Sequence, residues 1–237
     1  HQSRRTGLSP GLAVVCLAAL LAGCATPPAP TNSIFLPPPP DEPHMQYLVG
    51  FSSEDQLFSQ KGFRNFVLGA DRSYKPIGKP YGVAASHNRL YVCDTLGATV
   101  AVLKLDKRVL QYLRSRGAGA RSLPLNAAVD EQGNIYVADS GREQVLMYAP
   151  DFTYLGALGR KDEMQPRGVA VQGGKLYVAD IRNHVIRVYR LKDKQLLSTL
   201  PKAGSGPEAR LYSPTNVAVD QQGRVYVSDT GAFCVQV

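Results

Sequence analysis

One short phrase occurs four times in this chain, and it constrains the fold more than any other feature. Each copy begins with a proline, continues through small apolar residues and a turn, and ends in Tyr-Val-x-Asp. The closing aspartates are Asp94, Asp139, Asp180 and Asp229, which are 45, 41 and 49 residues apart. A period of this length, built only from strand and turn signals, is typical of a β-propeller with one blade per repeat.

Each repeat contains signals for four strands. The first strand is small and apolar, as expected near the axis of a wheel, and a hairpin turn with Gly133, Gly223 or Asn88 follows it. The second strand is almost wholly apolar, which indicates burial on both faces, whereas the third alternates between apolar and polar residues. A fourth, outer strand is predicted at Val109–Leu113, Thr153–Leu158 and Gln195–Leu200.

The repeated pattern, P-x-G/N-V-A-V-D-x-x-G-x-[IVL]-Y-V-A-D, resembles the NHL repeat over residues 76–237. This resemblance implies an all-β fold, a β-propeller of four-stranded NHL-type blades that usually has six blades. Only four blades are present, so we expect an incomplete ring that lacks two. The resemblance leaves the function open, because proteins with this propeller fold include lyases, lactonases, RNA binders and interaction platforms.

Residues 1–23 carry the features of a bacterial lipoprotein signal peptide. Arg4 and Arg5 form a basic start, and the apolar run Leu12–Leu21 is too short to span a bilayer. The sequence L-A-G-C that ends at Cys24 resembles the lipobox, which predicts lipidation of Cys24. Because no aspartate follows Cys24, anchoring in the outer membrane, periplasmic or surface-exposed, is expected rather than retention in the inner membrane.

Two segments separate the leader from the repeats. Residues 24–43 are rich in proline, which predicts an extended tether of about 3 Å per residue. Residues 44–75 contain Gln46–Phe51, which resembles an outer strand and is predicted to complete the ring.

The chain is basic, with 27 Lys and Arg against 19 Asp and Glu. A basic face would suit RNA, but an exported protein does not meet RNA, so we expect no nucleic acid. The basic segment Lys104–Arg108 is interpreted as a solvated rim, with an acidic polymer or glycan as a weaker alternative ligand.

The cysteines and histidines do not indicate a metal site or a cofactor. Cys93 occupies a slot that holds Ala or Ser in the other repeats, which predicts a buried thiol, and a disulfide with Cys234 is not expected. His184 belongs to a D-x-x-N-H turn and is interpreted as structural. His87 lies in a hairpin turn, and neither histidine is at the start of an inner strand, which argues against a histidine metal site. The closing aspartates are likewise predicted to accept backbone N–H bonds rather than to act in catalysis.

A ligand site is predicted where the inner strands begin, at the mouth of the central channel. Tyr81, Asn126, Arg167 and Asn216 vary between blades there, while their surroundings repeat. Lactonase-type propellers are similar in placing Asn and acidic side chains on a divalent cation at this mouth. No acidic residue occupies these positions here, so a metal site would need ligands from further blades.

The sequence therefore predicts a lipid-anchored, extracytoplasmic platform that binds an envelope protein partner, with no catalytic residues of its own. The alternative is a propeller enzyme of the lyase or lactonase type, whose metal lies at the channel mouth and is completed by the missing blades.

Overall fold

The computed structural model describes residues 34–38, 40–42, 44–47, 50–52, 76–107, 109–113 and 117–237. The predicted signal peptide, Cys24 and residues 53–75 lie outside these ranges, and the predictions made for them stay predictions. The chain divides into two compact units, with the boundary between Gly50 and Phe51.

The first unit contains a two-stranded antiparallel sheet of β1 (Ile34–Leu36) and β2 (Met45–Tyr47). Strand β1, which was not expected, lies inside the predicted tether of residues 24–43, and the tether itself stays a prediction. Three apolar residues between the prolines are enough to form a strand once β2 supplies a partner. Whether the segment around β2 completes the ring stays a prediction.

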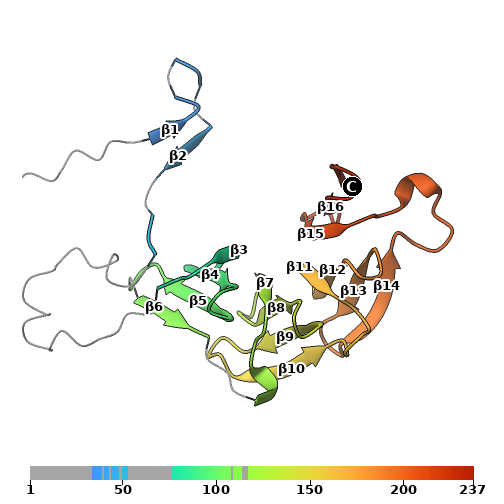
Figure 1. Cartoon of the computed structure of the whole chain (residues 1–237), viewed down its shortest axis with the longest axis horizontal. Helices are drawn as coiled ribbons and strands as arrows, with labels where there is room; N and C mark the ends of the chain where they lie inside the picture. The colour runs from blue at the N-terminus through green and yellow to red at the C-terminus, as the bar shows by residue number, and fades with distance from the viewer. Residues whose placement is uncertain are drawn as a thin grey trace, which may run out of the picture. The chain divides into compact units, whose positions relative to one another are not determined.

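The second unit holds four antiparallel sheets, which are the four blades (Figure 1). Three blades have four strands, and the fourth has three within the described residues. Blade 1 contains β3 (Pro80–Ser86), β4 (Arg89–Asp94), β5 (Thr99–Lys104) and β6 (Val109–Tyr112). Blade 2 contains β7 (Pro124–Val129), β8 (Ile135–Asp139), β9 (Gln144–Tyr148) and β10 (Tyr154–Leu158). Blade 3 contains β11 (Pro166–Gln172), β12 (Lys175–Asp180), β13 (Val185–Arg190) and β14 (Gln195–Leu200), and blade 4 contains β15 (Pro214–Val219), β16 (Val225–Asp229) and β17 (Cys234–Gln236).

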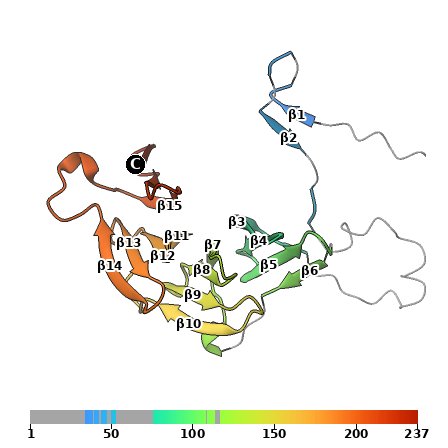
Figure 2. The ribbon, with the colours of Figure 1, turned by 180° about the vertical axis from the view of Figure 1, so that it is seen from behind.

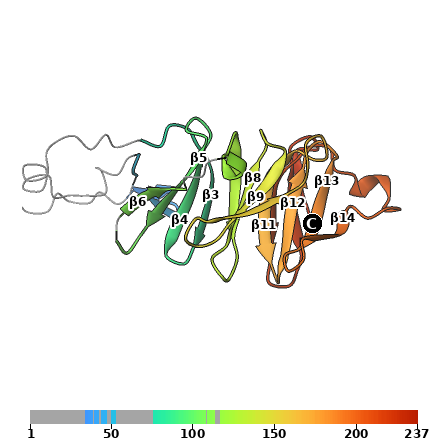
Figure 3. The same cartoon turned by 90° about the horizontal axis from the view of Figure 1, so that it is seen from below.

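The strands of each blade pair in chain order, and the blades follow one another in the same order (Figures 2 and 3). The first strand of each blade is the inner one, and β7 lies beside β3 and β11, while β11 lies beside β15. This arrangement confirms the predicted β-propeller. The short 3₁₀ helices η2 (Gly117–Gly119) and η3 (Pro207–Ala209) precede blades 2 and 4. No helix in the described ranges is long and apolar enough to cross a membrane.

The hairpin turns have the predicted backbone conformation. Gly133 and Gly223 have φ angles of +84° and +81°, and Asn88 has a φ of +57°. These positive angles are unstrained for glycine and tolerated by asparagine, which explains the residue choice in each turn.

The hydrophobic core lies between neighbouring blades rather than within one of them. Each of three clusters combines side chains from two adjacent blades. At the junction of blades 2 and 3, for example, Tyr136 and Met147 pack with Val169, Leu176 and Tyr189. Since full burial of one such apolar side chain stabilises by roughly 1.5–3 kcal/mol, each blade depends on its neighbours for stability.

The third strands differ from the sequence prediction. The first five residues of β5 are all buried, and β9 is buried from Val145 to Tyr148, so the expected alternation was wrong in blades 1 and 2. Strand β9 is covered on its two faces by blades 1 and 3. One face of β5 packs on blade 2, and the other packs with Leu110 of its own blade and with Phe51 and Ile77. Periodicity along one strand does not reveal a neighbour that is distant in sequence.

Candidate functional site

The four closing aspartates define one end of each blade, here called the aspartate end. Asp94 accepts hydrogen bonds from the backbone N–H groups of Gly78, Lys79, Leu96 and Gly97. Asp229 accepts from Tyr212, Ser213 and Gly231 in the same way. The predicted structural role is thus confirmed, and each carboxylate also fastens the link that precedes its own inner strand.

These backbone donors set the acidity of the carboxyls. Burial alone would raise the pKa of Asp94, but the four N–H donors outweigh burial and hold that pKa below its ordinary value. The pKa of Asp229 is lowered by the same balance. Both groups therefore stay ionised at neutral pH as part of the scaffold.

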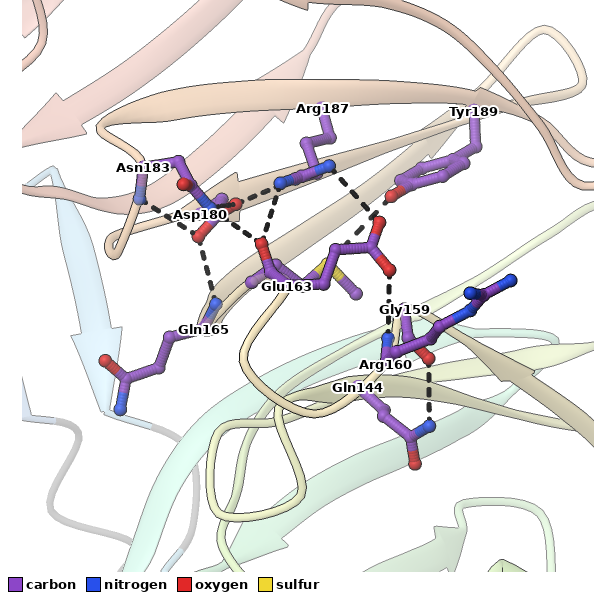
Figure 4. A network of polar contacts seen from close by, with 10 residues as sticks. Gln144, Gly159, Arg160, Glu163, Gln165, Asp180, Asn183, Arg187 and Tyr189 are labelled. Carbon is purple, nitrogen blue, oxygen red and sulfur yellow. Dashed lines mark hydrogen bonds and ion pairs between the residues drawn. The ribbon is translucent and has the colours of Figure 1, made fainter.

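In blade 3 the aspartate has a charged partner, drawn in Figure 4. Arg187 donates from Nε to Asp180 Oδ2 at 2.7 Å and from Nη2 to the Glu163 backbone oxygen at 2.9 Å. The Asp180 side chain is fully buried and also accepts from the Gln165 N–H and from Asn183 (Figure 4). This network joins the link before β11 to β12 and β13.

A second recurring feature lies in the turn after each aspartate. The fourth residue beyond the aspartate has a left-handed backbone in every blade: Ala98, Glu143, His184 and Phe233 have φ angles of +46°, +60°, +56° and +55°. Glu143 forms an ion pair with Arg182 of blade 3, at 2.5 Å between Oε1 and Nη2. His184 donates from Nδ1 to the Tyr212 backbone oxygen in the link to blade 4, as a structural histidine would. In blades 2 and 3 the turn residue thus contacts the next blade or the link that leads to it.

The two predicted asparagines direct their oxygen atoms into the scaffold. Asn126 Oδ1 accepts from the Val169 N–H of the adjacent blade at 3.2 Å, and Asn216 Oδ1 accepts from the Val217 N–H at 2.9 Å. An amide oxygen has two lone pairs, so each of these oxygens uses one of them to hold a backbone N–H of the scaffold. Within the described residues, no group of three or more His, Cys, Asp or Glu is placed to hold a metal ion.

The other two predicted residues differ from each other in burial. Tyr81 on β3 is 63% exposed, whereas Arg167 on β11 is half-buried. Arg167 lies where the pairing of β11 with β12 is interrupted by a bulge, between Pro166 and Gly168. Its Nε is buried and has no hydrogen-bond partner among the described residues.

The inner strands approach each other most closely beside these residues. A Cβ atom added to Gly168 would lie 2.7 Å from the Asn216 Cα, and one added to Gly82 would lie 2.3 Å from the Leu125 backbone oxygen. Only glycine allows these approaches, so the Gly and Asn residues of successive blades form a packed belt that carries Arg167.

The aspartate end also exposes apolar and aromatic side chains that the sequence analysis did not single out. Leu96, in the turn after Asp94, is 75% exposed, and Tyr212, whose N–H is bonded to Asp229, is 51% exposed. Arg210 stacks on Tyr212, with its guanidinium carbon 5.3 Å from the ring centroid. This pair belongs to the long link 201–213, which contains η3 and projects from the blades in Figure 1.

A hollow of about 530 Å³ lies at the opposite end of the inner strands, among the hairpin turns of blades 1 to 3. His87, which belongs to its lining, contacts Ser86 Oγ through Nδ1 at 2.7 Å and the Glu131 backbone oxygen through Nε2 at 3.1 Å. Both ring nitrogens are engaged, so His87 joins the hairpin turns of blades 1 and 2. The hollow is far along the inner strands from the predicted channel-mouth residues.

Comparison with known proteins agrees with this architecture. The model of the NHL repeat matches residues 164–189 and 211–237, which cover much of blades 3 and 4. A search of curated proteins found no match. A streptogramin B lyase structure is similar with a TM-score of 0.52 and 13% identity, over 66% of this chain and 50% of that one.

Two further solved structures have comparable similarity. A catalytically inactive virginiamycin B lyase from Staphylococcus aureus with quinupristin has a TM-score of 0.50 and 12% identity, over 67% of this chain and 54% of that one. A nidogen/laminin complex has a TM-score of 0.51 and 17% identity, over 66% and 60%. The chain spans about half the length of the lyases that it matches, and at these identities the likeness shows the fold alone.

Proposed function

Because this chain is an NHL-repeat β-propeller protein, we propose that it binds a protein partner through the aspartate end of its blades, while a lipid on Cys24 holds it in the bacterial cell envelope. The observation that carries the binding role is the exposed Arg210–Tyr212 pair on the projecting link 201–213. Tyr and Arg are enriched among the residues that dominate binding energy at protein interfaces.

Neighbouring features of the aspartate end support the same role. Leu96 and Leu123, which are 75% and 38% exposed, add apolar surface in the turns and links of blades 1 and 2. A rigid scaffold that carries exposed loops is a common design for recognition. One of the similar structures is also a protein complex, of nidogen and laminin.

The lyase or lactonase alternative has less support. The names of the similar lyases describe those proteins, and the oxygens of Asn126 and Asn216 are already bonded to backbone N–H groups. Within the part of the chain that the structure describes, no group of three or more His, Cys, Asp or Glu is placed to hold a metal ion beside them.

The envelope location rests on the sequence L-A-G-C at residues 21–24. Lipidation is tested by metabolic labelling with an alkyne fatty acid in the wild type and in Cys24→Ser. We expect label and membrane association in the wild type and neither in the variant. Equal labelling of both would contradict the anchor.

Partner binding is tested by cross-linking the full-length protein in membranes and identifying captured proteins by mass spectrometry. The double variant Leu96→Ser/Tyr212→Ser is compared with Leu196→Ser, which alters an exposed leucine on the outer strand β14. We expect one near-stoichiometric partner with the wild type and with Leu196→Ser, and its loss with the double variant. No partner, or one that all three proteins retain, would contradict the proposal.

A further inference from the structure

Three polar residues of the inner strands have hydrogen-bond donors that are not used within the described residues. The oxygens of Asn126 and Asn216 each accept a backbone N–H, from Val169 and Val217, which fixes the orientation of the two amides. Their Nδ2 groups make no hydrogen bond to the described residues, and each still has two N–H donors. The guanidinium of Arg167 has donors only.

Arg167 differs from other arginines of the same blade. Arg187 binds Asp180 and Glu163, and Arg182 binds Glu143, whereas Arg167 forms no hydrogen bond or ion pair within the described residues. A buried donor without an acceptor costs free energy, so such donors are rare in folded proteins. The Arg167 side chain as a whole is only half-buried, so its exposed part can meet an acceptor from another molecule.

The backbone holds these residues close to one another. Strand β11 lies between β7 and β15, and Asn126 reaches β11 through Val169, two residues after Arg167. Asn216 touches β11 at Gly168, where an added Cβ would lie 2.7 Å from both its Cα and its Oδ1. A bulge at Arg167 changes the direction of its side chain relative to a regular strand.

We infer that Arg167, Asn126 and Asn216 form a binding site for a carboxylate, supplied by an Asp or Glu side chain of the protein partner. The planar guanidinium suits a carboxylate through two parallel hydrogen bonds, and the amide groups add neutral donors beside it. This inference rests on the proposed function, since it names a chemical group of the partner that binds at the aspartate end, where Leu96 and Tyr212 are exposed.

The inference is tested with fluorescein-labelled dodecapeptides in which a central Asp or Glu is flanked by Tyr, Leu or Phe. Each peptide has a twin with Asn or Gln in place of the acid, and a second twin with phosphoserine. Anisotropy titrations use the full chain as wild type, Arg167→Gln, Arg167→Lys and the control Arg160→Gln. Arg160 is an exposed arginine of the link before β11 and tests for a general charge effect.

We expect the best acidic peptides to bind the wild type and Arg160→Gln about tenfold more tightly than their amide twins, as for a hydrogen bond to a charged group. In Arg167→Gln the ratio of the two affinities, acidic peptide over amide twin, falls to about one. In Arg167→Lys this ratio is intermediate, because the positive charge remains but the two parallel N–H donors of the guanidinium are lost. The unfolding midpoint of each variant shows that the blades are intact.

Other outcomes separate this inference from the proposed function. Three results would each overturn the carboxylate site. The acidic and amide peptides bind equally, Arg167→Gln still prefers the acidic peptide over its amide twin, or the phosphoserine peptides bind more tightly than the acidic ones. If Leu96→Ser/Tyr212→Ser still abolishes peptide binding in those cases, the platform itself stands. Binding of no peptide, while the wild type retains its cross-linked partner, overturns the carboxylate site alone.

Discussion

The amide oxygen of Asn126 on β7 accepts a hydrogen bond from the backbone N–H of Val169 on β11, at 3.2 Å. One side chain thus joins the inner strands of two blades, at a point where Val169 is buried in the cluster between them. The same residue faces the scaffold through its oxygen and keeps its N–H₂ group for another acceptor.

Replacement of Asn126 should therefore destabilise the propeller. Asn126→Ala leaves the buried Val169 N–H without an acceptor, so we expect the free energy of unfolding to fall by about 1–3 kcal/mol in urea titrations. Asn126→Asp keeps an acceptor and should cost less. Asn216→Ala is the control, because Asn216 is exposed and bonds only its own neighbour Val217. An equal loss in Asn126→Ala and Asn216→Ala would contradict the bridging role.

Gly168 should not accept a side chain. In Gly168→Ala the new Cβ would lie 2.7 Å from a backbone atom of Asn216, so the inner strands must move apart. We expect a loss of about 1–3 kcal/mol, typical of overpacking, in the same titrations. Gly173→Asn is a matched control, since nothing lies within 4 Å of an added Cβ there and Asn tolerates its φ of +56°. Equal stability of Gly168→Ala and Gly173→Asn would contradict the close approach of the inner strands at Gly168.

Removal of the cation beside Asp180 should be more costly than removal of a surface ion pair. Arg187→Met leaves the fully buried Asp180 carboxylate without its charged partner, and we expect a loss of about 3 kcal/mol at pH 7. Arg182→Met breaks the more exposed pair with Glu143, which solvent screens, and should cost clearly less. Thermal and urea unfolding of both variants measure this difference, and the reverse order would refute it.

The lowered pKa values of Asp94 and Asp229 predict a loss of stability in acid. Their ionised forms are favoured in the folded state, so the stabilisation is present above the unfolded pKa of about 3.9. It is lost as the pH falls further, through the lower folded pKa values. Urea midpoints between pH 7 and pH 2.5 should therefore drop mainly below pH 4. In Asp94→Asn the drop should be smaller and the stability at pH 7 lower; an unchanged acid profile would contradict this assignment.

The two cysteines of the repeats should differ in reactivity. Burial raises the pKa of the Cys93 thiol to about 12, whereas Cys234 is an exposed free thiol. Because the thiolate is the reactive form, iodoacetamide at pH 8 should modify Cys234 in the native protein and Cys93 only after unfolding. Peptide mass spectrometry after timed quenching measures both rates. Modification of native Cys93 at a rate like that of Cys234 would show that its site opens.

The blades could be predicted from the sequence because their determinants are local. The proline before the inner strand, the glycine or asparagine in the hairpin and the closing aspartate each act within one repeat. The aspartate was expected to bond the following turn, and it does, but the second set of donors comes from the preceding link. Strand β1 and the burial of both faces of β5 were not predicted, because both depend on partners that periodicity does not show.

The channel-mouth residues show where such prediction ends. Asn126 and Asn216 are predicted to face a ligand because this position varies between blades. Part of that variation follows from packing, because Gly82 and Gly168 occupy the same position in the alternate blades and lie against the two asparagines. Which atom of each amide faces the scaffold depends on strands of another blade. The exposed Arg210–Tyr212 pair has no repeat counterpart, and an irregular link offers only composition as a signal.

The left-handed turn residues Glu143 and His184 support two blade junctions with different kinds of contact. An ion pair from Glu143 supports the junction of blades 2 and 3, so salt should weaken it, whereas a hydrogen bond from the His184 imidazole to a backbone oxygen supports the junction of blades 3 and 4. Hydrogen exchange at raised ionic strength should accelerate first beside Glu143 and Arg182. A single backbone position thus lets point mutations adjust the rigidity of one sector of the wheel independently of the rest.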